Sequence, residues 1–178
     1  IIFLGGSQGA AAINNLALNL APNLRQKGMK IIHQCGKNSL ESLRAQYDKL
    51  GFIGDELELF AFDPKIELKM READIAVSRA GASTLWELAA NALPSVFVPY
   101  PYAANNHQVY NAKFLVDQNL AKFCFQQGGE IDANEVLNLI NEIDIARISS
   151  KLSKQIDNGG ARKIADEILK ARTLNQNL

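Results

Sequence analysis

Short apolar runs alternate with amphipathic stretches along most of the chain, and this alternation restricts the possible folds more than any other feature. In the amphipathic stretches, apolar residues recur at helical spacing. The apolar runs are short enough to be buried strands. The predicted strands are residues 1–4, 30–34, 57–60, 74–77, 95–99 and 121–125. Strands that alternate with helices form a parallel sheet with helices on both faces. We therefore predict an α/β fold of this kind.

Several residues mark the expected helix ends. Pro22 is expected to kink or split the first helix, and Gly28 to end it. Asn38 is predicted to cap the second helix, and the pair Asp63-Pro64 to begin the third. Further helices are expected over residues 84–91, 106–117 and 132–140, the last capped by Asp132, and over a final amphipathic stretch around residues 161–169.

Composition limits the class of protein. The 178 residues suffice for one domain with a full core. Basic and acidic residues balance at 19 each, which argues against a nucleic-acid partner. Cys35 and Cys124 are expected to be buried, reduced thiols of a cytosolic protein. No run is long enough to cross a bilayer and no signal peptide is visible. Because the chain starts within a buried-strand pattern and lacks an initiator methionine, we expect a fragment of a longer protein.

The first candidate motif is the glycine-rich turn after the first strand, Gly5-Gly6-Ser7-Gln8-Gly9-Ala10. It is not a P-loop, because no Gly-Lys-Ser/Thr follows, and the G-x-G-x-x-G spacing fails in every register. Glycine allows a ligand to approach the backbone closely. The turn is therefore a candidate phosphate contact, and a plain tight turn between strand and helix is the alternative.

The second motif follows the fourth strand, where a small-residue loop leads into a helix at residues 78–90. Gly81 permits the turn. Ser83 and Thr84 can present hydroxyls and free backbone N–H groups to phosphate oxygens. Arg79 can either neutralise charge or pin the loop.

Glu87 lies one turn into that helix and has two open interpretations. Its spacing from Thr84 fits a capping box, in which the carboxylate binds the Thr84 N–H. Alternatively, its two acceptor oxygens bind the hydroxyls of a ribose. The neighbouring Trp86 is expected to be a core or shelf residue.

The third motif is the loop after the fifth strand, from Pro99 to Gln108. Asn106 and Gln108 can each donate and accept hydrogen bonds, which suits sugar hydroxyls. A polar loop with asparagine caps is the alternative, and His107 is a weak candidate for a general base. Because all three motifs follow strands, and parallel sheets bind ligands at the carboxyl ends of their strands, they predict a nucleotide-diphosphate site.

Other chemistries lack the residues they need. The two histidines have no spaced cysteine or carboxylate partners for a metal site. No Asp-x-Asp pair is present to hold a metal-bound diphosphate. No Ser–His–Asp or Cys–His arrangement is suggested by local context.

Together these segments resemble the carboxyl-terminal half of the MurG family. These bacterial enzymes transfer N-acetylglucosamine onto the lipid-linked muramyl-pentapeptide precursor of peptidoglycan. The resemblance is close over residues 1 to about 119 and looser beyond. Its most specific parts are the glycine turn, His33-Gln34-Cys35-Gly36, the segment from Ser78 to Glu87, and the segment from Leu93 to Pro101.

The resemblance implies a Rossmann-like parallel sheet that forms one half of a two-domain GT-B glycosyltransferase. Residues 1–178 would be the domain that binds the donor. Its last helices, about residues 132–173, would pack on the sheet or back toward the missing amino-terminal domain. That missing domain would bind the lipid acceptor, face the membrane and carry the general base, which this chain does not identify.

The resemblance also implies roles for individual residues. Those expected to contact the diphosphate and neighbouring parts of the donor are Gly6, Ser7, Gln8, Ala82, Ser83, Thr84 and Leu85. Arg79 is a further candidate contact on its own chemistry, as a cation in the same loop. Phe62 falls where the family recognises uracil through backbone atoms, and Glu87 corresponds to the ribose-binding acid. Gln108 corresponds to a contact to the sugar hydroxyls, with Asn111 close by.

The implied reaction is that of an inverting hexosyltransferase. UDP-N-acetylglucosamine would be the donor, and the C4 hydroxyl of the lipid-linked N-acetylmuramyl-pentapeptide would attack it. The resemblance implies no tightly bound cofactor, no metal and no nucleic-acid partner. It places the full-length enzyme in the cytoplasm, peripheral on the inner membrane, and we expect this chain alone to bind donor without turnover.

Three other functions remain as alternatives. One is a stand-alone nucleotide-sugar-binding subunit that needs a membrane partner. A UDP-sugar 2-epimerase shares the two-domain fold, but its acid and base residues are not evident here. A flavodoxin-like module would need a Ser/Thr-rich phosphate loop, which the sequence lacks.

Overall fold

The computed structural model describes residues 1–6, 9–155 and 159–175, and within them the chain forms a parallel six-stranded sheet. The strand order is β3-β2-β1-β4-β5-β6, the order of doubly wound nucleotide-binding folds. The strands are β1 (Ile2–Leu4), β2 (Ile31–Gln34), β3 (Leu57–Phe60), β4 (Ala76–Ser78), β5 (Ser95–Phe97) and β6 (Ala121–Phe123). The predicted α/β class and all six strands are therefore confirmed.

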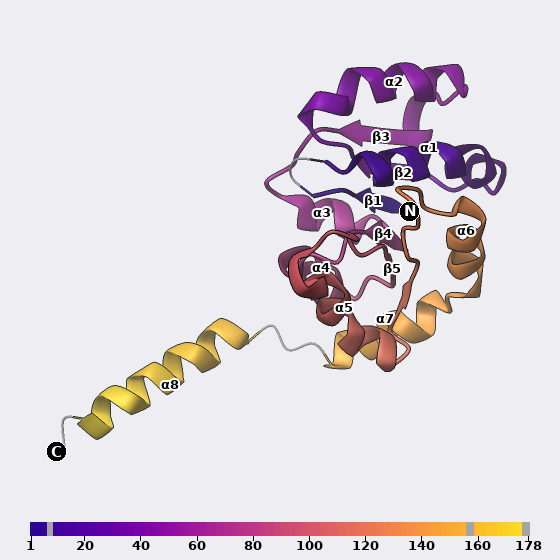
Figure 1. The fold of residues 1–178 in the computed structure, drawn as a ribbon. Coiled ribbons are helices and arrows are strands. Elements are labelled where there is room, and N and C mark those ends of the chain that lie inside the picture. Colours follow the sequence, from indigo (N-terminus) through magenta and orange to yellow (C-terminus); the bar gives the residue numbers. More distant parts are fainter. Residues whose placement is uncertain (7–8, 156–158, 176–178) are drawn as a thin grey trace.

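Helices cover the sheet on both sides (Figure 1). The helix α1 packs between α2 and α6, while α4 packs against α3, α5 and α7. The α-helices are α1 (Ala11–Gln26), α2 (Leu40–Lys49), α3 (Ile66–Arg71), α4 (Ala82–Ala90), α5 (His107–Asp117), α6 (Ala133–Glu142), α7 (Ile145–Gln155) and α8 (Gly160–Asn175). The described part of the chain also contains three short 3₁₀ helices, η1 (Lys37–Ser39), η2 (Gly54–Glu56) and η3 (Ala104–Asn106).

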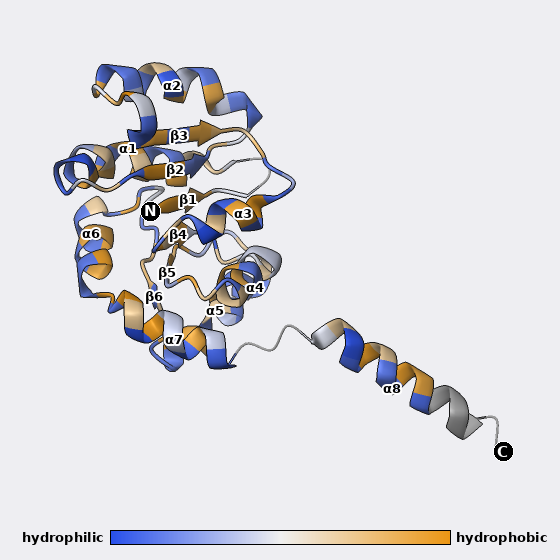
Figure 2. Ribbon diagram, turned by 180° about the vertical axis from the view of Figure 1, so that it is seen from behind, coloured by the Kyte–Doolittle hydropathy of each residue, from blue (hydrophilic) through white to orange (hydrophobic). Residues whose placement is uncertain are grey.

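The central strands are buried on both faces, which explains why their sequences are apolar runs rather than alternating patterns. Every residue of β1, β2, β4 and β5 is buried. Figure 2 shows this apolar sheet between helices whose outward faces are hydrophilic. Cys35 and Cys124 are buried free thiols, as predicted.

Two predicted helix starts are wrong, and one predicted split does not occur. Pro22 lies inside an unbroken α1 and does not split it. The helix α2 begins after η1, and neither its N-cap residue, Ser39, nor Asn38 makes a capping side-chain bond. Asp63 does not start α3; its Oδ1 accepts the Lys65 N–H at 2.8 Å in a local turn, and the helix begins at Ile66.

Two other helix ends follow the sequence. Gly28 adopts a φ of 68° just beyond α1, the conformation that favours glycine after a helix. Asp132 caps α6, where its Oδ1 accepts the N–H groups of Asn134 and Glu135 at 2.8 and 3.3 Å. Both ends agree with the sequence prediction, because each depends on a local interaction.

The helix α7 is an element that the sequence analysis does not predict. Its apolar residues Ile145, Ile148 and Leu152 recur at helical spacing, and Ile148 and Leu152 are buried. Asp144 accepts the Arg147 N–H at 3.0 Å and so caps this helix. Both signals are local, so this helix is readable from the sequence in principle.

The helix α8 stands away from the sheet and its flanking helices (Figure 1). Over residues 160–170 every side chain is exposed, including Ile164, Ile168 and Leu169. No helix within the described residues has the length and apolar character needed to cross a membrane.

Candidate functional site

The glycine turn joins β1 to α1 at the carboxyl edge of the sheet. Gly6 and Gly9 have φ values of 85° and 77°, and the Gly9 N–H donates to the Gly6 carbonyl at 3.0 Å. A Cβ atom at Gly9 would lie 2.3 Å from the Cys35 carbonyl oxygen, so only glycine fits against the end of β2. Ser7 and Gln8, both predicted to be ligand contacts, lie outside the described residues.

Two helix N-termini open at this edge of the sheet. Among the described residues no side chain caps α1 or α4, and neither helix has an acidic residue in its first turn. The first N–H groups of a helix have no partner within it, and they carry the positive end of the helix dipole. An anion held between the two helices would therefore be stabilised from both sides.

The start of α4 decides between the two interpretations of Glu87. The helix begins at Ala82 with Gly81 as the N-cap residue, rather than at Thr84. No capping box between Thr84 and Glu87 is formed, so that interpretation is wrong. The Glu87 carboxylate is exposed and makes no hydrogen bond or ion pair with the described residues.

Leu85 is placed differently from the other predicted contacts in this loop. Its side chain is fully buried, and its N–H donates to the Gly81 carbonyl at 2.9 Å. It therefore packs α4 onto the core and presents neither group to a ligand. Ala82 and Ser83 are exposed, and Thr84 is partly exposed at the first turn of the helix.

The larger cavity at this edge has a volume of about 710 Å³. Its walls come from the glycine turn, the start of α1, and the loops after β4, β5 and β6. Among its lining residues are Gly6, Gly9, Arg79, Thr84, Tyr100 and Gln108. The three predicted motifs therefore meet around one cavity.

A smaller cavity of about 290 Å³ adjoins the first. Phe62 and Glu87 line it from opposite elements, the segment after β3 and the helix α4. Gly6 and Thr84 line both cavities. The glycine turn and the first turn of α4 thus lie at the junction between a small compartment that contains a free carboxylate and a larger compartment.

Phe62 is half-exposed in the smaller cavity, with 57% of its surface accessible. Its backbone N–H and carbonyl make no hydrogen bond with the described residues, whereas the preceding Ala61 carbonyl accepts the Gly36 N–H. Phe62 therefore has a free backbone donor and acceptor beside the cavity, as recognition of a base through backbone atoms requires.

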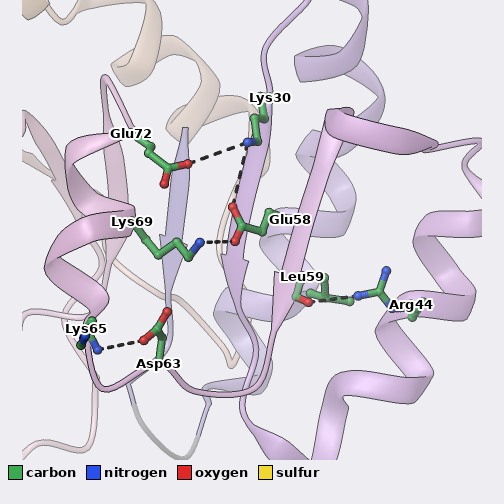
Figure 3. Close-up of polar contacts among 8 residues, drawn as sticks. All are labelled: Lys30, Arg44, Glu58, Leu59, Asp63, Lys65, Lys69 and Glu72. Atoms are coloured by element: carbon green, nitrogen blue, oxygen red, sulfur yellow. Dashed lines mark hydrogen bonds and ion pairs between the residues drawn. The ribbon is translucent and has the colours of Figure 1, made fainter.

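An ion-pair network connects α3 to the neighbouring strands of the sheet (Figure 3). Lys69 of α3 pairs with Glu58 of β3, and Lys30 lies 3.9 Å from both Glu58 and Glu72. These side chains are partly exposed, so each pair contributes little free energy by itself. Together they hold α3, which lines the cavity, against β3, the outermost strand of the sheet.

Gln108 is oriented by two backbone donors. Its Oε1 accepts the N–H groups of Ala80 and Tyr100, at 3.2 and 2.9 Å. Its carbonyl is therefore occupied, and its NH₂ group has no partner among the described residues. Since Gln108 lines the larger cavity, it can act there as a hydrogen-bond donor to a ligand hydroxyl.

Asn111 and Arg79 hold the surrounding loops together. Asn111 donates from Nδ2 to the Ala80 carbonyl at 3.1 Å. The Arg79 guanidinium donates to the carbonyls of Val98 and Pro99, at 3.1 and 3.3 Å, and to Oε1 of Gln126 at 2.8 Å. Of the two roles considered for Arg79, the structure shows the second: its hydrogen bonds hold the loop after β4 against the segments that follow β5 and β6.

Sequence reasoning missed part of the larger cavity. Gln126 and Gly129, from the segment after β6, and Asn15, from the second turn of α1, also line it. The pair Gly128-Gly129 follows the last strand, where the rule applied to the other strands also predicts a ligand-binding loop. Asn15 left no such signal, because one exposed asparagine in a helix is common.

His107 lies outside both cavities. It is exposed, and its Nδ1 lies 3.0 Å from the Ala104 carbonyl. This arrangement gives no support to His107 as a general base. Within the part of the chain that the structure describes, no three His, Cys, Asp or Glu residues are grouped as a metal site would require.

Comparison with protein families gives a match over residues 1–170 to the glycosyltransferase family 28 C-terminal domain. The chain is 54% identical over 170 residues to a Campylobacter fetus protein named UDP-N-acetylglucosamine--N-acetylmuramyl-(pentapeptide) pyrophosphoryl-undecaprenol N-acetylglucosamine transferase. It is 49% identical over 169 residues to a Wolinella succinogenes protein of the same name. The matches cover 96% and 95% of this chain, and 49% and 48% of those proteins. The chain thus spans about half the length of these relatives.

Solved structures agree with this result. The crystal structure of Acinetobacter baumannii MurG superposes with a TM-score of 0.76 at 32% identity, covering 95% of this chain and 49% of that one. A Phytolacca americana UGT2, complexed with UDP-2fluoro-glucose and pterostilbene, has a TM-score of 0.68 at 17% identity, covering 96% and 41%. The second likeness concerns the fold alone. The predicted Rossmann-like fold and the resemblance to MurG are confirmed.

Proposed function

This chain belongs to the glycosyltransferase family 28 C-terminal domains, and from that premise we propose that it is the donor-binding half of a UDP-N-acetylglucosamine-dependent transferase. The whole enzyme would move N-acetylglucosamine to the C4 hydroxyl of a lipid-linked N-acetylmuramyl-pentapeptide in peptidoglycan synthesis. The names of its relatives support this donor and acceptor.

One observation supports the donor site most directly: the two cavities share Gly6 and Thr84. In this proposal the uridine occupies the smaller cavity, with Glu87 on the ribose hydroxyls and the Phe62 backbone on the base. The diphosphate lies at the junction between the two helix N-termini. The sugar extends into the larger cavity, where the Gln108 NH₂ group donates to a hydroxyl.

The position of the carboxylate fits this order of groups. Glu87 would repel a diphosphate placed beside it, and it lies in the second turn of α4, beyond the N-terminal N–H groups. The ribose therefore separates the acid from the phosphates. A carboxylate is suited to a vicinal diol, because both of its oxygens accept hydrogen bonds.

The proposed chemical role of this half is to hold the leaving group. As the acceptor hydroxyl attacks C1 with inversion, negative charge builds on the departing UDP. The N–H groups of α1 and α4 are oriented before the reaction, so they stabilise that charge without reorganising. One such donor can lower the barrier by about 3 kcal/mol.

The remainder of the longer protein would supply the acceptor site, the general base and the contact with the cytoplasmic face of the inner membrane. We propose that α6 and α7 stay with the donor domain, since they pack on α1, β5 and α4. The exposed side chains of Ile164 and Ile168 on α8 would then pack against that remainder.

Isothermal titration calorimetry of this chain with UDP, UDP-N-acetylglucosamine and UDP-glucose tests the proposal. We expect UDP and UDP-N-acetylglucosamine to bind, and UDP-glucose to bind no more tightly than UDP. Absence of UDP binding at millimolar concentration would contradict the donor site. Equal affinity for the two sugar nucleotides, both above that of UDP, would contradict the choice of N-acetylglucosamine.

A further inference from the structure

A chain of buried polar side chains runs beneath the glycine turn and links three elements. Tyr47 of α2, His33 of β2 and Asn14 of α1 are 0%, 0% and 3% exposed. His33 Nδ1 lies 3.0 Å from the Tyr47 hydroxyl, and its Nε2 lies 3.0 Å from Asn14 Oδ1. Asn14 Nδ2 donates to the Cys35 carbonyl at 3.1 Å. None of these three side chains lines either cavity.

The direction of every hydrogen bond in this chain follows from its last member. A carbonyl oxygen only accepts, so Asn14 must donate to Cys35 through Nδ2 and must accept through Oδ1. His33 therefore carries its proton on Nε2. Its Nδ1 is left as an acceptor, and Tyr47 donates to it. The opposite order would place Asn14 Oδ1 against the Cys35 oxygen, with two acceptors in contact.

Burial of this network agrees with a neutral histidine. Desolvation lowers the pKa of His33 to about 4 and raises the pKa of Tyr47. Buried polar groups are costly unless they are paired. Here both ring nitrogens of His33 are paired, so the network is satisfied in one tautomer.

The network ends on a residue that contacts a wall of the larger cavity, the glycine turn. The Cys35 carbonyl is the atom against which Gly9 packs, with room for no Cβ. The N–H groups of Cys35 and Gly36 donate to the carbonyls of Phe60 and Ala61, immediately before Phe62. A shift of this carbonyl would therefore move the glycine turn directly.

We propose that Tyr47, His33 and Asn14 form a positioning relay for the diphosphate site, with Tyr47 and His33 acting only through the Cys35 carbonyl. The relay holds that carbonyl where the glycine turn packs on it, and so sets the affinity for the diphosphate. This inference rests on the proposed donor function, because UDP is the ligand whose affinity reports it.

The variant Tyr47→Phe tests the relay in the 178-residue chain. It removes the hydroxyl that keeps His33 Nδ1 an acceptor and preserves the ring that packs on Phe52. We expect UDP to bind about five-fold more weakly, the change that the loss of one hydrogen bond typically produces. Uridine should bind with nearly unchanged affinity, because it lacks the diphosphate that the glycine turn contacts.

Ser95→Ala is the matched control. Ser95 is also buried and also makes a side-chain hydrogen bond, from Oγ to the Leu93 carbonyl at 3.0 Å. It is the first residue of β5, at the amino-terminal ends of the strands, whereas the cavities lie at their carboxyl ends. Urea denaturation should show that both variants lose stability, whereas only Tyr47→Phe should lose affinity for UDP.

The tautomer of His33 provides a readout that does not depend on binding. Long-range ¹H–¹⁵N NMR spectra of the wild-type chain should show Nε2 protonated and Nδ1 unprotonated. Protonation on Nδ1 instead would overturn the relay, because it reverses the hydrogen bond to Tyr47.

The binding measurements distinguish failure of the relay from failure of the proposed donor function. Wild-type protein that binds UDP, with unchanged affinity in Tyr47→Phe, would overturn the relay and leave the donor site standing. Wild-type protein that does not bind UDP would overturn the proposed function, and this inference with it. An equal loss of UDP affinity in Ser95→Ala would also overturn the relay, since the effect would then be one of general stability.

Discussion

At the scale of single residues, the role of Glu87 depends on where its helix starts. A start at Thr84 would have placed its carboxylate on a backbone N–H. With the N-cap at Gly81, the same carboxylate is exposed and lines the smaller cavity beside Phe62. A shift of three residues in the helix start thus separates a structural carboxylate from one that is free to bind a ligand.

We expect Glu87→Gln to weaken UDP binding by about tenfold or more, because a charged acceptor of two ribose hydroxyls is replaced by an amide with one acceptor oxygen. Glu41→Gln is the matched control, since Glu41 is also exposed on a helix and lines neither cavity. Calorimetry with UDP compares them. Unchanged affinity in Glu87→Gln would remove the ribose role.

His33 makes stability depend on pH in a defined direction. The unfolded chain takes up the imidazole proton below about pH 6.5, whereas the folded protein takes it up only near its pKa of about 4. Protonation therefore favours the unfolded state, and the free energy of unfolding falls as the pH drops through this window.

Between about pH 7 and about pH 4.5 the loss from His33 should be roughly 2–3 kcal/mol. Urea denaturation of the wild type and of His33→Gln at both pH values measures it. The carboxylates titrate alike in both proteins, so the difference between them isolates the histidine. An equal loss in the two proteins would contradict a buried neutral His33.

At the scale of elements, the glycine turn is defined by two separate requirements. Gly9 needs a positive φ, which several other glycines share, and it also needs the absence of a Cβ. The second requirement arises from β2, because the Cys35 carbonyl occupies the space that a side chain would need. The turn is thus shaped by a neighbouring strand as well as by its own backbone.

Gly9→Ala and Gly28→Ala separate these requirements. Gly28 has a similar φ, 68°, and a Cβ added there would have no atom within 4 Å. We expect Gly28→Ala to cost about 1 kcal/mol of unfolding free energy, from backbone strain alone. Gly9→Ala should cost at least about 2 kcal/mol more, because a backbone carbonyl must move. Equal losses in urea denaturation would show that Cys35 does not constrain the turn.

At the scale of the whole molecule, the two cavities and the core of the described residues lie before α8. The two cavities are lined by residues between Leu4 and Gly129. The helix α8 contributes no buried side chain over residues 160–170. The apolar residues in that range therefore stabilise neither the sheet nor the site.

Removal of residues 159–178 should leave the free energy of unfolding unchanged within about 0.5 kcal/mol, the usual range for changes at exposed positions. UDP affinity should also be unchanged. Urea denaturation and calorimetry of the shortened chain test both expectations. A large loss of stability would mean that α8 packs on the domain in solution.

The sequence alone determined the layered architecture. Apolar runs alternating with amphipathic stretches predict a parallel sheet, because hydrophobic period and element length are local properties. The caps of α1 and α6 were equally readable, since Gly28 and Asp132 act on their own helices. The three motifs could also be placed at one edge of the sheet, because parallel strands all end on the same side.

Only the tertiary structure decided which polar side chains are hydrogen-bonded within the protein and which remain available to a ligand. Arg79 reaches Gln126, and Tyr47 reaches Asn14 through His33, across separations that no local pattern encodes. These contacts depend on the strand order, which places β1 between β2 and β4. The hydrophobic period identifies the strands, but it does not give their order in the sheet. The junction between the two cavities and the hydrogen-bond network beneath it therefore form only when the sheet is assembled.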